Sequence, residues 1–167
     1  ISVATVQYFS KRAEDQASFL LQEGIRKYDA LLEDKQPQEA LKLVEADFQS
    51  IINDYSGTIS GKFALIQLAG MYFSAGKYDE SIALYEKALD SLRTSKLFEN
   101  LTQMGLGQCY EAKGDPEKAI GYFEKIVQDP NGLGKGEALF HLGRIYGNKG
   151  DTARQNESYQ KLVEEHG

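Results

Sequence analysis

The sequence predicts an all-α fold: an α-α superhelix of about four helix–turn–helix pairs. One motif carries most of this prediction, because the segment 106–110, Leu-Gly-Gln-Cys-Tyr, has counterparts at 68–72 and 142–146. The tyrosines that end these segments follow one another at intervals of 38 and 36 residues. That spacing is close to the period of about 34 residues found in arrays of stacked helical pairs. The 167 residues are enough for four pairs around one core.

Composition narrows the classes of function. Hydrophobic residues make up 41% of the chain and charged residues 26%, which is ordinary for a folded domain. The formal net charge of −6 disfavours a nucleic-acid partner, because contact with phosphates needs clustered positive charge. Cys109 is the single cysteine, so neither an intrachain disulfide nor a cysteine metal cage can form. Its place beside Tyr110 in a helix favours a buried small side chain over a reactive thiol.

Residues 3–58 are expected to form the first, divergent helical pair. Apolar residues recur at steps of three and four over about 3–33, which indicates an amphipathic helix. Pro37 suits the first turn of the second helix, because its missing N–H would have no intrahelical partner there. Turn-forming residues over 53–58 end this pair, and Ser60 is expected to cap the next helix.

Three further pairs are expected at 60–94, 95–130 and 133–166, so that 1–167 is one domain. Gly76 is expected to end the first helix of its pair, since a left-handed backbone brings glycine no steric clash. The last helix, from about Thr152, is rich in polar residues, as the terminal helix of an array needs to be for solubility.

These residues resemble the tetratricopeptide repeat family, whose pattern is W-x-x-L-G-x-x-Y, then A-x-x-x-F, then P. The best match has Gln103 at the tryptophan position and is otherwise complete through Leu106, Gly107, Tyr110, Ala119, Phe123 and Pro130. The flanking repeats depart further, with Leu65 and Leu139 at the aromatic position. The resemblance covers 60–166 well and 10–55 weakly. It implies an array that binds proteins or peptides in a concave groove lined by the first helix of each pair.

Within that family, the divergent first pair and the link 54–58 are similar in layout to bacterial cell-envelope members. These include the YfgM-like ancillary subunits of the protein-export translocon, the outer-membrane assembly lipoproteins and the Tol-Pal cell-division coordinator. This resemblance implies a location on the periplasmic side of a bacterial inner membrane, with the cytoplasm as the alternative. Apolar and aromatic residues over 1–9 precede Lys11 and Arg12. They are either the tail of a membrane anchor or simply the first turns of the first helix.

The groove is expected at positions of the first helices that are offset from the Leu-Gly core positions. The residues assigned to it are Phe63, Ile66, Phe73, Leu101, Met104, Gln108, Glu111, Phe140 and Arg144. An apolar floor with charged neighbours suits a peptide that buries a few large side chains. Two alternatives stay open: the phenylalanines pack against their own neighbouring helices, or the N-terminal helix of the same or another copy fills the groove.

Catalysis, cofactors and metals find no support in the sequence. The two histidines, His141 and His166, lie far apart, and a hydrogen-bonding role for His141 is favoured over metal ligation. The glycine-rich segment 132–136 lacks the spacing of a phosphate-binding loop. We therefore expect a non-enzymatic adaptor or scaffold for another protein. A self-associating scaffold and a regulatory domain of a larger enzyme are the alternatives.

Overall fold

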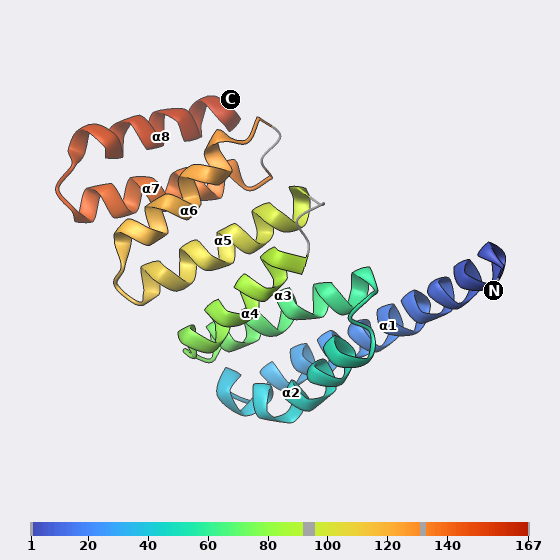
Figure 1. The fold of residues 1–167 in the computed structure, drawn as a ribbon. Helices are drawn as coiled ribbons and strands as arrows, with labels where there is room; N and C mark the ends of the chain where they lie inside the picture. Colours follow the sequence, from blue (N-terminus) through green and yellow to red (C-terminus); the bar gives the residue numbers. More distant parts are fainter. Residues whose placement is uncertain (1, 92–95, 131–132, 167) are drawn as a thin grey trace. The chain divides into compact units, whose positions relative to one another are not determined.

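A computed structural model describes residues 2–91, 96–130 and 133–166 (Figure 1). These residues form eight α-helices and no strand, which confirms the predicted all-α class of helical repeats. The helices, in chain order, are α1 Val3–Leu32, α2 Pro37–Asp54, α3 Ile59–Ser74, α4 Tyr78–Ser91, α5 Lys96–Ala112, α6 Pro116–Gln128, α7 Lys135–Asn148 and α8 Thr152–His166. Each predicted helix therefore exists, and the predicted ends differ from the observed ones by only a few residues.

The chain divides into two compact units, Ile1–Ser91 with α1–α4 and Leu92–Gly167 with α5–α8. Each unit thus contains two successive helical pairs. The single domain expected over 1–167 stays a prediction, and the two units are described one at a time.

In the first unit, α1 packs against both α2 and α3, and α3 packs against α4. The centre consists of fully buried side chains, chiefly Leu41, Val44, Phe48 and Leu68. Only the second part of α1 contributes to it, through residues such as Ala17 and Tyr28. All residues from 2 to 12 are exposed, and Figure 1 shows this part of α1, in dark blue, projecting past α2.

The start of α3 differs from the expectation in an informative way. Thr58, not Ser60, is the N-cap residue, and its Oγ1 accepts a hydrogen bond from the Gly61 N–H at 2.9 Å. The next two backbone N–H groups, of Ile59 and Ser60, donate instead to the Glu14 carboxylate of α1 at 2.7 and 2.9 Å. The Ser60 hydroxyl also donates to Glu14, at 2.6 Å. A carboxylate from α1 therefore completes the cap of α3 and favourably meets the positive end of that helix.

We expect Glu14→Gln to lower the free energy of unfolding by ~1 kcal/mol near neutral pH, comparable to the loss of a helix cap. Partial burial raises the pKa of the Glu14 carboxyl, but the hydrogen bonds from Ser60 and Ile59 outweigh it and leave the pKa below its ordinary value. A lowered folded-state pKa stabilises the protein above the unfolded pKa, and this stability is lost as pH falls through the folded value. We therefore expect the difference in free energy of unfolding between the unmodified protein and the Glu14→Gln variant, measured by urea unfolding, to become smaller from pH 7 to pH 3. A difference independent of pH would contradict this role of the charge.

In the second unit, glycines allow the two helices of each pair to approach closely. A Cβ on Gly107 of α5 would lie 2.5 Å from the Phe123 ring of α6, and a Cβ on Gly143 of α7 would lie 2.4 Å from the Tyr159 ring of α8. Phe123 is fully buried, as is Cys109, which confirms the interpretation of this thiol as a core residue. The repeated small residue is therefore needed because an aromatic ring of the second helix occupies the space of its side chain.

Tyrosine–glutamate contacts join each unit's two pairs. Tyr72 of α3 donates to Glu45 of α2, and Tyr146 of α7 donates to Glu124 of α6 at 3.0 Å. Burial first, and then the carboxylate that accepts the hydrogen bond, raise the pKa of Tyr72 to about 12 and that of Tyr146 in the same direction. Both phenols therefore stay protonated and act as donors across the physiological range. Tyr72 and Tyr146 of the sequence motif thus each link their own pair to the preceding pair of the same unit.

Candidate functional site

The residues predicted to line the groove fall into both units. Phe63, Ile66 and Phe73 belong to α3 in the first unit, and the other six belong to α5 and α7 in the second. Most of the six predicted groove residues in the second unit lie close together. We therefore take the surface formed by α5 and α7 as the candidate site.

The three α3 residues offer little open surface. Ile66 is 8% exposed and is a core residue, which is a correction to its assignment as a surface residue. Phe63 and Phe73 are partly buried, and the Phe73 ring packs on Tyr78 of the partner helix with centroids 5.5 Å apart. The alternative in which phenylalanines pack against their own neighbours therefore holds for Phe73. A hollow of about 340 Å³ lies beside Ile66 and Gly70, between α1, α3 and α4.

Met104 is also a core residue and not a groove residue. It is 8% exposed and belongs to a buried cluster with Ile120 and Phe123 of α6 and Leu142 of α7. Its terminal methyl lies 3.3 Å from where a Cβ of Gly134 would be, at the start of α7. Helices α6 and α7 therefore cover Met104, although it lies on the same stripe of α5 as Leu101 and Gln108.

An ionic network connects α5 to α7. The Glu111 carboxylate lies 2.8 Å from Nδ1 of His141 and 2.9 Å from Nη2 of Arg144. The Arg144 nitrogen is also 3.1 Å from Nδ1 of His141. Because arginine cannot accept a hydrogen bond, we assign the Nδ1 proton to the contact with the Glu111 carboxylate. Arg144 then donates to the same carboxylate oxygen. The Glu111 and His141 side chains are only 18% and 13% exposed. This confirms that His141 acts through hydrogen bonding, and it makes the network a rigid support for the surface above it.

Above this network, α7 presents an open aromatic ring beside a cation. Phe140 is 49% exposed, and the Arg144 guanidinium lies over its ring, 5.9 Å from the centroid. The Arg144 side chain is itself 47% exposed. Because Glu111 fixes the guanidinium, the ring and the cation keep one arrangement without a ligand. Such preorganisation lowers the entropy lost on binding.

The α5 side of the same face carries one further exposed apolar residue and a polar bridge. Leu101 is 43% exposed. Gln108, two turns later, donates from Nε2 to Glu137 of α7 at 2.9 Å. Leu101, Gln108 and Glu111 share one stripe of α5, since they follow at steps of seven and three. We call the surface formed by Leu101, Gln108, Glu111, Glu137, Phe140 and Arg144 the α5–α7 face.

Sequence reasoning missed the pairing of Gln108 with Glu137 and the supporting role of His141. The partners are about 30 residues apart, at Gln108–Glu137 and Glu111–His141. A constant offset of 29–30 residues between the first helices of neighbouring repeats is the signal that could have paired them. It becomes visible only once the register of α5 against α7 is known.

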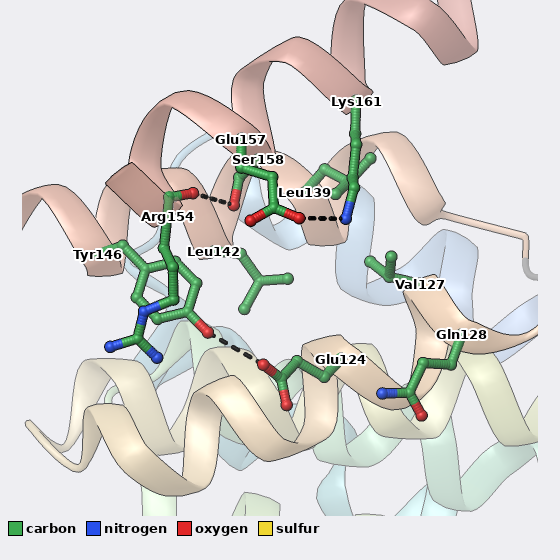
Figure 2. A pocket seen from close by; sticks show the side chains of 10 residues that line it. All are labelled: Glu124, Val127, Gln128, Leu139, Leu142, Tyr146, Arg154, Glu157, Ser158 and Lys161. Carbon is green, nitrogen blue, oxygen red and sulfur yellow. Dashed lines mark hydrogen bonds and ion pairs between the residues drawn. The ribbon is translucent and has the colours of Figure 1, made fainter. Parts of the chain in front are cut away.

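A second hollow of about 230 Å³ lies between α6, α7 and α8, with Val127, Leu139 and Leu142 among its lining residues. Figure 2 shows that several of its polar groups are already engaged with one another. Lys161 donates to Glu157 at 2.6 Å, and Ser158 donates to the Arg154 carbonyl at 2.8 Å. Because a ligand would have to break these contacts, this hollow is the weaker candidate.

Two searches of the described residues give negative results. Over 2–91, 96–130 and 133–166, histidine, cysteine and acidic side chains form no group of three suited to holding a metal ion. In the same ranges no helix combines the length and the apolar character required to cross a membrane.

Comparison with known proteins agrees with the repeat pattern. Two family models, both described as tetratricopeptide repeat, match residues 63–128 and 137–167. Together they span more than half of the 167 residues, and they cover α5 to α8 almost entirely. A search of curated proteins finds no match. Tetratricopeptide repeats generally mediate protein–protein interaction, and this chain belongs to the tetratricopeptide repeat family.

Proposed function

We propose that this protein is a non-enzymatic adaptor that binds a segment of another protein on the α5–α7 face. The observation that carries the proposal is the half-exposed Phe140 ring beside the Arg144 guanidinium, which the partly buried Glu111 carboxylate holds in place. An exposed aromatic residue next to a fixed guanidinium is the composition typical of binding hot spots. The family, whose repeats bind proteins, supports the same conclusion.

The spacing on the face indicates what the bound segment looks like. Leu101 stands at one end of the α5 stripe and Glu111, next to Arg144, at the other. Ten residues of helix correspond to ~15 Å. A bound segment therefore needs two large apolar side chains separated by about that distance, one for Leu101 and one for Phe140. Between these two positions, the Glu137 carboxylate can accept hydrogen bonds from the backbone of the bound segment, and the Gln108 amide can donate or accept them.

We expect Phe140→Ala to weaken peptide binding at least ~10-fold, because truncating a central anchor costs about 2 kcal/mol or more. Peptides selected against the whole chain from a random display library would serve as probes, and their affinity would be measured by fluorescence anisotropy. Folding should be unchanged, since half of the ring is exposed.

Leu133→Ala is the matched control, because Leu133 is a large apolar residue that is 62% exposed outside the α5–α7 face. This variant should bind the selected peptides as the unmodified protein does. Equal affinities for all three proteins would contradict the proposal that the α5–α7 face is the binding site.

We also propose, from the likeness in layout to YfgM-like translocon subunits, that the partner is a protein of export or assembly at the bacterial cell envelope. The exposed Tyr8, followed by the basic pair Lys11 and Arg12, supports a place near a membrane surface. A translational reporter fused to the full gene would test this, with activity of a periplasm-dependent reporter as the expected result. Activity of a cytoplasm-dependent reporter alone would contradict it and leave the cytoplasmic alternative.

A further inference from the structure

One stripe of α1 is exposed or only partly buried along most of the helix. The residues at 6, 9, 13, 16, 20, 23 and 27 follow at alternating steps of three and four, so they share one face. In its first half this face is apolar, with Val6 57% and Phe9 60% exposed. The core of the unit uses a different stripe, which includes Ala17, Leu21 and Tyr28.

In its second half, the same stripe forms one wall of a groove. A hollow of about 560 Å³ runs between α1 and α2, with Leu20, Gly24 and Ile51 as its apolar part. A Cβ on Gly24 would lie 3.0 Å from the Phe48 ring of the core, so this position stays small and α1 lies close to α2 beneath the groove. The projecting half of α1 and the groove are therefore two unfilled parts of one continuous surface.

The charges of the two parts are opposite. The stretch 1–13 contains Lys11 and Arg12 and no acidic residue. The groove is bordered by Glu23, Asp47 and Asp54. Lys27 also lines the groove, and its Nζ lies 2.6 Å from Asp47.

We propose that two copies of this chain pair through α1, in antiparallel orientation, each placing Val6 and Phe9 in the groove of the other. In this register residue 16 of one copy meets residue 16 of the other on the two-fold axis, Phe9 lies opposite Glu23 and next to Gly24 of the second copy, and Ala13 lies next to Leu20. Arg12 then comes near Asp54 of the second copy, because Asp54 lines the same end of the groove as Leu20. An isologous pair of this kind has closed two-fold symmetry, so the same surface cannot bind a third copy.

A second copy fits better than a lipid surface for a reason of composition. The stripe contains Gln16, Glu23 and Lys27 in line with its apolar residues. A groove bordered by acidic residues has no electrostatic attraction to anionic lipid. The stripe from 6 to 27 is ~30 Å long, and three polar positions within it favour a reversible dimer over a permanent one. Pairing would present two α5–α7 faces in one assembly, which raises the avidity for a partner that carries two binding segments.

Sedimentation velocity of the whole chain over two decades of concentration tests the proposal. The unmodified protein should shift from monomer to dimer as concentration rises, and the double variant Val6→Glu, Phe9→Glu should stay monomeric throughout. At concentrations where both proteins are monomeric, its thermal melting should match that of the unmodified protein, since both side chains are exposed in the monomer. Val163→Glu on α8 is the matched control, at a valine that is 71% exposed, and should dimerise normally.

A cysteine at the two-fold axis tests the register. Gln16→Cys should form a disulfide-linked dimer on mild oxidation, whereas Ala46→Cys, exposed on α2, should not, and the native Cys109 is buried and does not compete. A monomer at every concentration, a dimer that survives the double variant, or equal cross-linking from both cysteines would overturn the proposal. Monomers that cosediment with phosphatidylglycerol vesicles through Val6 and Phe9 would overturn it in favour of a membrane surface.

Discussion

Replacing Gly107 with leucine should unfold the α5–α6 pair, lowering the free energy of unfolding by ~3 kcal/mol or more. Even a Cβ at this position would lie 2.5 Å from the Phe123 ring, and the ring is fully buried in the cluster with Met104, Ile126 and Leu142. Urea unfolding followed by circular dichroism would measure the loss. Because the C-terminal unit has its own core, the unfolding transition should broaden or split instead of only shifting.

Gly121→Ala in α6 is the control for this prediction. Gly121 is exposed, and an added Cβ would meet no atom within 4 Å. Alanine should therefore raise the stability by about 0.5–1 kcal/mol, because glycine is unfavourable inside a helix. If both glycine variants unfolded like the unmodified protein, the assigned register of α5 against α6 would be wrong.

Met104→Glu should have an effect of similar size, for a different reason. A carboxylate at Met104 would be buried among Ile120, Phe123 and Leu142, which carry no charge to pair with it. An uncompensated buried charge destabilises a protein by roughly 3–5 kcal/mol. Chemical denaturation at neutral pH would measure the loss, which should become smaller in acid as the carboxyl takes up a proton.

Leu101→Glu is the matched control, one turn earlier on the same stripe of α5. Its side chain is 43% exposed, so a glutamate there can stay hydrated and should change stability by less than ~1 kcal/mol. Equal unfolding midpoints for the Met104 and Leu101 variants would show that Met104 is a surface residue after all.

The order of helices and the close contacts within each pair could be predicted from the sequence, because both depend on local patterns. A period of three to four residues defines a helix, and the Leu-Gly-x-x-Tyr motif places Gly107 opposite an aromatic residue of the next helix. Pro37 and Gly76 mark a helix start and a helix end through backbone constraints of their own, and the structure shows both, with Gly76 at φ 73°.

The candidate site could be predicted only in part, because it depends on how one repeat rotates against the next. Ile66 and Met104 were assigned to the groove from their position relative to the motif, yet the neighbouring helices cover them. The ionic network of Glu111 needs partners 30 residues away in α7. The cap of α3 by Glu14 bridges 45 residues. No local pattern encodes such pairings, since they follow from tertiary register alone.

Photo-crosslinking inside cells tests most directly whether the α5–α7 face binds another protein. A photoreactive amino acid would replace Phe140 or, separately, Leu101, and Gly121 would carry the same group as a control, since it is exposed and has open space around it. We predict that both face positions crosslink to one and the same protein, identified by mass spectrometry, and that position 121 does not. Two outcomes would contradict the account of the α5–α7 face as an adaptor surface. One is crosslinking from position 121 alone, and the other is crosslinking only to a second copy of this chain.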